Sequence, residues 1–233
     1  MIQALVFDFD GLILDTEWPE YLSWQEQYQA AGCELPLTTW IESIGTTAQF
    51  DPYALLAELS GGPVDIAAVR AARRARFAEL MAAQTPLPGV LEYLDAAKRR
   101  GLKLGVASSS SRDWVEGYLA QHGLAGLFDC VKCSDDVPNV KPDPALYRAV
   151  LDALGVAAHA ALALEDSLNG LAAAKAAGLF CVVVPNRLMQ GHRFDQADLR
   201  LDSLAHMPLE RVIQFFTAKA QSTQRPEERG NRK

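Results

Sequence analysis

Polar side chains that could carry out phosphoryl chemistry follow apolar runs at four places in this sequence. In chain order they are Asp8 and Asp10, Ser108 and Ser109, Lys141, and Glu165 and Asp166. Carboxylates are hard oxygen ligands that suit Mg²⁺, and a lysine supplies a positive charge for phosphate. A single Asp or Ser after a strand most often only caps the next helix. Four such places in one chain instead indicate a site built at the ends of several strands.

The charges of these groups are compatible with binding a phosphate dianion. With Asp10 protonated, the other three carboxylates total −3, and Lys141 with one Mg²⁺ totals +3. The Ser108 hydroxyl and the backbone N–H groups after it are suited to phosphoryl oxygens. A carboxylate also serves as a covalent nucleophile at phosphorus.

Five apolar runs must position these residues, and they read as buried strands. They cover residues 2–7, 102–107, 128–133, 161–164 and 179–184. Helical patterns that end at glycines lie between the later runs, over 89–100, 111–122, 142–154 and 168–177. This alternation predicts an α/β fold with a doubly wound, mainly parallel, Rossmann-like sheet. Ligands of such sheets bind beyond the carboxyl ends of the strands, where all the residues named above are expected.

The alternation stops between residues 15 and 86, where the pattern predicts four helices instead. They cover 18–31, 37–44, 52–59 and 64–83. We interpret residues 15–86 as a helical cap inserted into a discontinuous catalytic core of residues 1–14 and 87–216. Residues 217–233 are polar and charged, and we expect a disordered tail.

Composition excludes several classes of protein. The net charge of −7 over 233 residues argues against partners such as nucleic acids or anionic membranes. The N-terminus lacks a basic segment, and no apolar run reaches the roughly 18 residues of a membrane span, so we expect a cytoplasmic protein. We also expect a monomer. Cys130 and Cys133 match a CxxC pattern, but a strand places them on opposite faces, which predicts a structural role.

The order and spacing of the four motifs resemble the haloacid dehalogenase superfamily of phosphohydrolases. The motifs are DFDGLILDTE at 8–17, Ser108, VKPDP around Lys141, and LEDSLNG at 164–170. The resemblance covers nearly the whole chain except the tail, and it points to the helical-cap branch with β-phosphoglucomutase-like phosphatases. The 98 positions between Asp10 and Ser108 accommodate the helical cap, whereas the 33 between Ser108 and Lys141 leave no room for the other cap type.

The resemblance implies a role for each motif residue. Asp8 is the nucleophile that forms an aspartyl-phosphate, and Asp10 is the general acid and then the general base. It implies that Mg²⁺ is held by Asp8, the Asp10 backbone carbonyl and Asp166, with Glu165 assisting. It assigns the phosphoryl group to Ser108 and Lys141, and we expect Ser109, next to Ser108, to contribute to substrate binding. The expected enzyme is a Mg²⁺-dependent hydrolase of a small phosphate monoester, such as a phosphosugar.

Three alternatives remain open. A phosphomutase of the β-phosphoglucomutase type carries an arginine in the cap loop for a second phosphate, and residues 44–49 (IGTTAQ) contain none. A phosphoryl-accepting receiver module would lack the cap, and its acceptor aspartate would not follow the first strand. A catalytically inactive binding protein would lack a motif residue, and none is missing.

Three features outside the motifs carry weaker expectations. Trp18, in an aromatic-rich first cap helix, is a candidate for lining the substrate pocket, although packing within the cap competes with that reading. We expect Trp114 to be a packing residue. The arginine run at 70–76 is interpreted as a solvated helix face.

Overall fold

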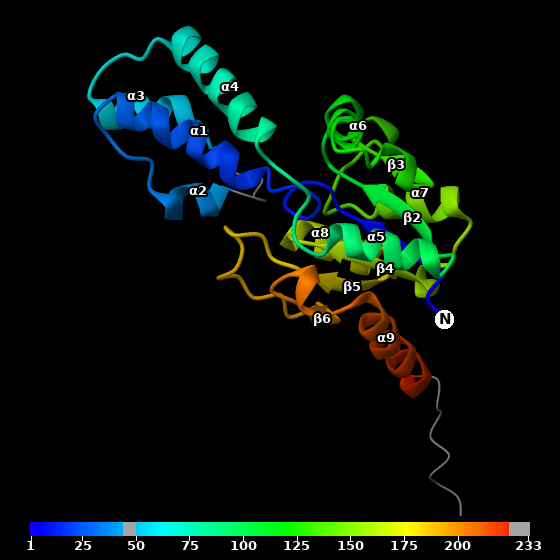
Figure 1. Cartoon of the computed structure of the whole chain (residues 1–233). Helices are drawn as coiled ribbons and strands as arrows, with labels where there is room; N and C mark the ends of the chain where they lie inside the picture. The colour runs from blue at the N-terminus through cyan, green and yellow to red at the C-terminus, as the bar shows by residue number, and fades with distance from the viewer. Residues whose placement is uncertain (44–49, 224–233) are drawn as a thin grey trace, which may run out of the picture.

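A six-stranded parallel sheet forms the centre of the molecule, with strand order β3-β2-β1-β4-β5-β6 (Figure 1). The computed structural model describes residues 1–43 and 50–223. The strands are β1 (Ala4–Phe7), β2 (Lys103–Ala107), β3 (Cys130–Lys132), β4 (Ala161–Glu165), β5 (Phe180–Val183) and β6 (Leu199–Arg200). All neighbouring pairs are parallel. The predicted doubly wound α/β fold is confirmed.

Helices cover both faces of the sheet, which explains why its strands are apolar on both sides. Leu5 and Phe7 of β1 face one apolar cluster, and Ala4 and Val6 face the other. The first face is covered by α5 (Val90–Arg99), α6 (Arg112–Gln121) and α9 (Leu209–Thr223). The second is covered by α7 (Ala145–Leu154) and α8 (Leu168–Ala176).

The two cysteines of the CxxC pattern lie on opposite sides of the sheet, as predicted. Cys133 is buried in the first apolar cluster, whereas Cys130 packs against the second. Both thiols are free. Burial raises the pKa of both thiols, so neither is activated as a nucleophile.

Four helices interrupt the alternation and stand apart from the sheet, joined to it by two chain segments (Figure 1). We call them the cap helices: α1 (Glu17–Ala30), α2 (Leu37–Ser43), α3 (Pro52–Ser60) and α4 (Ile66–Ala82). They enclose an apolar core of their own, the cap cluster. It contains Tyr21, Trp24, Tyr28, Leu35, Trp40 and Leu56, together with Leu188 from a distant loop. The arginine run is not merely solvated, because Arg73 and Arg76 of α4 form ion pairs with Glu20 and Glu26 of α1.

The two segments that connect the cap helices to the core are bonded to each other. The Leu87 N–H donates to the Ile13 carbonyl at 2.9 Å. Gly89 begins α5 with φ +92°, and a Cβ there would lie 2.3 Å from the Ala205 nitrogen. Only glycine fits this close approach, so the point where the chain re-enters the core is tightly fixed.

The C-terminal region differs from the expectation of a tail from residue 217. Helix α9 continues to Thr223, and its Lys219 pairs with Asp198 at 2.6 Å. Residues 217–223 are polar, so their sequence did not indicate a helix, yet they continue α9, which this ion pair anchors. The remainder of the expected tail lies outside the described residues. Within the described ranges, no helix has both the length and the apolar character needed to cross a membrane.

Candidate active site

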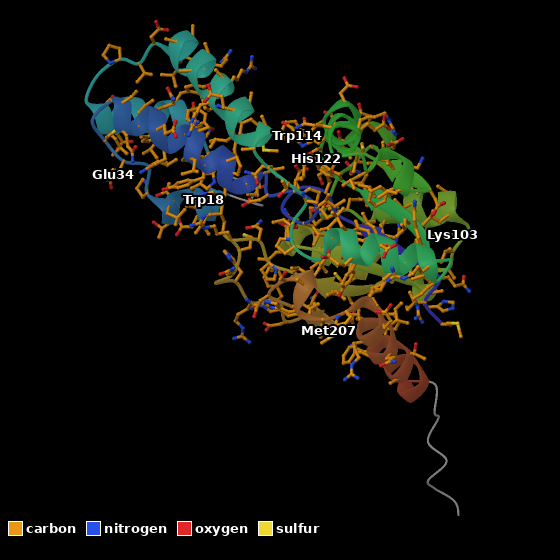
Figure 2. The ribbon with its side chains drawn as sticks, in the orientation of Figure 1. Trp18, Glu34, Lys103, Trp114, His122 and Met207 are labelled. Atoms are coloured by element: carbon orange, nitrogen blue, oxygen red, sulfur yellow. The ribbon has the colours of Figure 1, made fainter. Side chains whose placement is uncertain are left out.

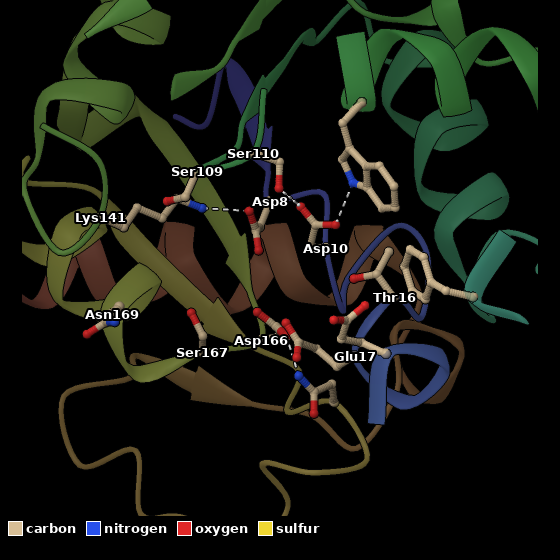
Figure 3. Close-up of a pocket in the computed structure, with 14 residues that line it drawn as sticks. Asp8, Asp10, Thr16, Glu17, Ser109, Ser110, Lys141, Asp166, Ser167 and Asn169 are labelled. Carbon is tan, nitrogen blue, oxygen red and sulfur yellow. Dashed lines mark hydrogen bonds and ion pairs between the residues drawn. The ribbon is translucent and has the colours of Figure 1, made fainter. Parts of the chain in front are cut away.

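A cavity of about 500 Å³ lies at the carboxyl ends of the strands, between the sheet and the cap helices (Figure 3). Its core side carries six of the polar residues that follow strands: Asp8, Asp10, Ser109, Ser110, Lys141 and Asp166. Its cap side carries four residues: Thr16, Glu17, Glu20 and Phe77. The strand ends therefore bring the sequence motifs together in one place.

Lys141 is the electrostatic centre of the core side. Its Nζ lies 2.6 Å from Asp8 Oδ1 and 2.6 Å from Glu165 Oε1, and its side chain is only 5% exposed. Burial alone would lower the pKa of Lys141, but the carboxylates of Asp8 and Glu165 raise it overall. Lys141 is therefore held as a cation beside Asp8.

Glu165 is enclosed by partners from its own chain. Its Oε1 also accepts a hydrogen bond from the Tyr147 hydroxyl, and its Oε2 accepts one from Ser167 Oγ at 3.4 Å. A Cβ on Gly170 would lie 1.8 Å from Oε2, so α8 needs glycine there to make room for the carboxylate. Glu165 does not line the cavity; it lies behind Lys141 and fixes it.

Asp8, Glu165 and Asp166 offer oxygen atoms that all lie within 4.8 Å of one another. Burial raises the pKa of Asp8 to about 7, with Lys141 opposing the shift. Burial, with the charges of Asp8 and Glu165, also raises the pKa of Asp166. When all three carboxylates are ionised, one lysine leaves uncompensated negative charge, which a divalent cation would neutralise. The donor set is all oxygen and fits Mg²⁺.

Asp10 is turned away from this cluster. Its Oδ2 accepts a hydrogen bond from Ser110 Oγ at 2.6 Å, and its Oδ1 accepts one from Trp114 Nε1 at 2.9 Å. Trp114 packs as expected, because its ring stacks on Phe77 at 5.7 Å, but its N–H also donates to Asp10 and orients that carboxylate. Its place in the first turn of the helix that follows the serine motif is the sequence signal that could have identified it.

The serine motif is arranged differently from the expectation. Ser108 is fully buried, and its Oγ donates to Asp10 Oδ2 at 3.3 Å while accepting from the Ser110 N–H at 3.0 Å. Ser109 and Ser110 line the cavity, whereas Ser108 does not. In this arrangement the Ser108 hydroxyl shapes the loop, and its contact with a phosphoryl group stays a prediction.

Trp18 does not line the cavity either. Its ring packs 5.3 Å from Tyr21, and the Arg187 guanidinium carbon lies 3.7 Å from its ring centroid. Figure 2 places Trp18 on the cap helix α1 and Trp114 on the core helix α6. Trp114 both packs and contacts Asp10 in the site, whereas Trp18, a candidate for the substrate pocket, packs between cap and core. Its cation–π contact with Arg187 joins those two parts.

Glu17 and Glu20 were missed as site residues. They lie three positions apart on α1, so both face the cavity. Burial raises the pKa of Glu17 to about 7, and the nearby charges of Asp10 and Glu20 add to the shift. Glu20 is paired with Arg73 at 2.7 Å. The spacing of two acids in the first turn of the first cap helix was the available signal.

Comparisons with known proteins agree with this geometry. A family profile described as haloacid dehalogenase-like hydrolase matches residues 2–178. A protein of Bacillus subtilis (strain 168) named "Putative phosphatase YhcW" is 46% identical over 94% of this chain and 99% of its own. Validoxylamine A 7'-phosphate phosphatase of Streptomyces hygroscopicus subsp. limoneus is 31% identical over 78% of this chain and 85% of its own.

A solved structure with a bound sugar bisphosphate is also similar. It is a variant of CbbY from Rhodobacter sphaeroides in complex with xylulose-(1,5)bisphosphate, with a TM-score of 0.69 and 35% identity. The match covers 88% of this chain and 96% of that one. The likeness therefore includes both the sheet and the cap helices.

Proposed function

The chain belongs to the haloacid dehalogenase-like hydrolase family, and from this we propose that it is a Mg²⁺-dependent phosphatase of a small phosphorylated metabolite. The observation that carries the proposal is Lys141, which bridges Asp8 and Glu165 beside Asp166 at the floor of one cavity. A lysine held beside a carboxylate is suited to bind the transferred phosphoryl group while the carboxylate attacks it.

The proposed reaction has two chemical steps, with Asp8 as nucleophile and Asp10 as general acid and base. An Asp8 oxygen attacks phosphorus, so a P–O bond to Asp8 forms while the ester P–O bond breaks, and Asp10 donates its proton to the leaving oxygen. Water then attacks the phosphorus of the aspartyl-phosphate, Asp10 accepts its proton, and the bond to Asp8 breaks to release phosphate. Ser110 and Trp114 hold Asp10 in place for both transfers. Mg²⁺, when bound by Asp8 and Asp166, supplies positive charge that stabilises the phosphoryl oxygens.

The cap side supports a sugar or polyol as the leaving group. Glu17 and Glu20 are acceptors for hydroxyl groups, and the rings of Phe77 and Trp114 can cover an apolar sugar face. Among the described residues, Lys141 is the only cation that lines the cavity. The segment 44–49 lies outside the described residues, and its sequence contains no Lys or Arg. A second phosphate therefore finds little compensation here, which disfavours the phosphomutase alternative.

A substrate panel tests the proposal. Purified protein with Mg²⁺ is offered sugar monophosphates, polyol monophosphates, xylulose 1,5-bisphosphate and 2-phosphoglycolate, and released phosphate is measured. We expect release from monophosphates of sugars or polyols, and none after exhaustive removal of Mg²⁺. Asp8→Asn should remove turnover, while circular dichroism shows an intact fold. A panel with no phosphate release, or full activity in Asp8→Asn, would overturn the proposal.

A further inference from the structure

A short loop after β5 connects the candidate metal site with the interior of the cap helices. Asn186 faces Asp166, Arg187 faces Trp18, and Leu188 is buried in the cap cluster. Leu188 is 4% exposed, and it is the only buried member of that cluster that does not come from the segment between Tyr21 and Leu56 in the described chain. Three consecutive residues therefore contact a proposed metal ligand, the first cap helix and the cap core.

Asn186 is held at both ends of its amide group. Its Oδ1 accepts the backbone N–H groups of Leu188 at 2.8 Å and Met189 at 3.1 Å. These two donors fix the oxygen end, so the NH₂ end is directed at Asp166, where Nδ2 donates to Oδ2 at 2.7 Å. This bond orients the Asp166 carboxylate, which belongs to the cluster of three acids whose oxygen atoms lie within 4.8 Å of one another.

The chain that enters the cap packs directly on this hydrogen bond. A Cβ on Gly11 would lie 2.0 Å from Asp166 Oδ2 and 3.0 Å from Asn186 Nδ2. Gly11 has φ +76°, a conformation that glycine adopts at little cost. The Asp166–Asn186 pair is therefore in contact both with Gly11, in the chain that leads into the cap, and with the backbone of residues 188 and 189.

We propose that Asn186 is a positioning residue for Asp166, and that Leu188 makes this positioning depend on the cap helices. While Leu188 is seated in the cap cluster, its N–H holds the Asn186 amide, which holds the Asp166 carboxylate. Movement of the cap away from the core withdraws the apolar surroundings of Leu188 and loosens this chain of bonds. Coupling between two sites is reciprocal, so binding of a divalent cation must in turn favour the docked cap. The inference rests on the proposed function only through Asp166 as a metal ligand.

Leu188 and Met189 form a matched pair for the test. Both are buried, and both donate a backbone N–H to Asn186. The Leu188 side chain lies in the cap cluster, whereas the Met189 side chain lies in the second apolar cluster, which packs on the sheet. Isothermal titration calorimetry with Mg²⁺ measures the dissociation constant of each variant. We expect Leu188→Ala to weaken Mg²⁺ binding about fivefold and Met189→Ala less than about twofold, although both lower thermal stability. Asn186→Ala should weaken it about tenfold.

Two further measurements keep the test decisive. Hydrogen exchange at the amides of Leu188 and Met189 should slow when Mg²⁺ is added to the wild type, and this protection should be lost in Leu188→Ala. If that variant does not fold, Arg187→Ala replaces it, because Arg187 is exposed and contacts the cap at Trp18. Leu188→Met should restore wild-type binding.

The outcomes separate this inference from the proposed function. Equal Mg²⁺ affinities in Leu188→Ala and Met189→Ala, or amide exchange that does not respond to Mg²⁺, would overturn the coupling and leave the phosphatase proposal standing. A wild type that binds no Mg²⁺ and releases no phosphate would overturn both.

Discussion

The two sides of the cavity are built in opposite ways. On the core side, Lys141 and Asp8 are paired with each other, with side chains 5% and 10% exposed, and the fully buried Glu165 behind Lys141 also pairs with it. On the cap side, Glu20 keeps 32% of its side chain exposed, and Glu17 and Phe77 are half-buried. The core side offers a fixed arrangement for a phosphoryl group, whereas the cap side can change with the leaving group.

The difference has a physical reason. Charges close to a reacting phosphorus must be in place before the reaction, because moving them during the step would cost activation free energy. Residues that recognise the remainder of the substrate need only accept hydrogen bonds and cover apolar surface. The core side should therefore respond to substitution with large losses of rate, and the cap side with small changes of preference.

Removal of the central lysine should have the largest effect. Lys141→Met leaves Asp8 and Glu165 buried without their cation, and we expect phosphate release to fall about 10³-fold or more. The free energy of unfolding should fall by about 3 kcal/mol. Activity assays and urea denaturation measure the two effects. Lys175→Met is the control, since its partner Asp198 is remote from the cavity; the contrast fails if both variants lose activity equally.

Loss of the indole donor should have an intermediate effect. Trp114→Phe keeps a ring that can stack on Phe77 but removes the hydrogen bond to Asp10. We expect kcat to fall about tenfold with little change in KM, because Asp10 acts in the chemical steps and not in ground-state binding. Tyr93→Phe is the control, since it removes a buried donor to the Met207 carbonyl and should leave kcat unchanged. A rise in KM alone would contradict the assignment.

The residues that sequence predicted best are those that directly follow strands. In a parallel sheet, the carboxyl end of each strand lies at the same edge, so topology brings Asp8 and Asp166 together, whereas Lys141 lies nine residues after β3 and reaches Asp8 through the connecting loop. The register of β1 with β4 then sets Asp8 beside the end of β4. This part of the site could be predicted without knowing any side-chain conformation.

The residues that sequence missed depend on loop paths and rotamers. Trp114 reaches Asp10 only because α6 begins immediately after the serine loop, and Asn186 reaches Asp166 only because its loop turns back at residues 188 and 189. Strand β6 has two residues, too few for an apolar pattern. The part of α9 beyond residue 216 is polar. The ion pair that anchors it joins Lys219 to Asp198, 21 residues earlier, so no local pattern predicts it.

Substitutions on the cap side should change the preference among substrates more than the rate of the chemical step. Glu17→Gln should alter kcat/KM for a sugar monophosphate by about three- to tenfold. Because the pKa of Glu17 is raised to about 7, its negative charge develops as the pH rises through 7. The wild type should therefore discriminate more strongly against a bisphosphate at pH 8 than at pH 6, and Glu17→Gln should remove this dependence. Glu26→Gln, on the same helix but paired with Arg76, is the control. Identical pH profiles for wild type and Glu17→Gln would refute the role.

Substitution of Asp198, an acid outside the cavity, should have the smallest effect on phosphate release. The pKa of Asp198 is also shifted in the opposite direction from that of Asp8. Around Asp8 the acids outnumber the lysine, whereas Asp198 lies 2.6 Å from both Lys175 and Lys219 and accepts the Cys181 N–H at 2.8 Å. Burial alone would raise the pKa of Asp198, but these donors lower it overall.

The sign of the pH dependence follows from that lowered pKa. The stabilisation by Asp198 is fully present above its unfolded pKa of about 3.9, and it is lost as the pH falls through the lower folded value. Asp198→Asn should lower the free energy of unfolding by about 1 kcal/mol at pH 7, with the difference shrinking below about pH 4. Urea denaturation across pH 3–8 measures it, and phosphate release should stay at the wild-type level. A difference that persists undiminished at pH 3 would show that packing, not charge, makes Asp198 stabilising.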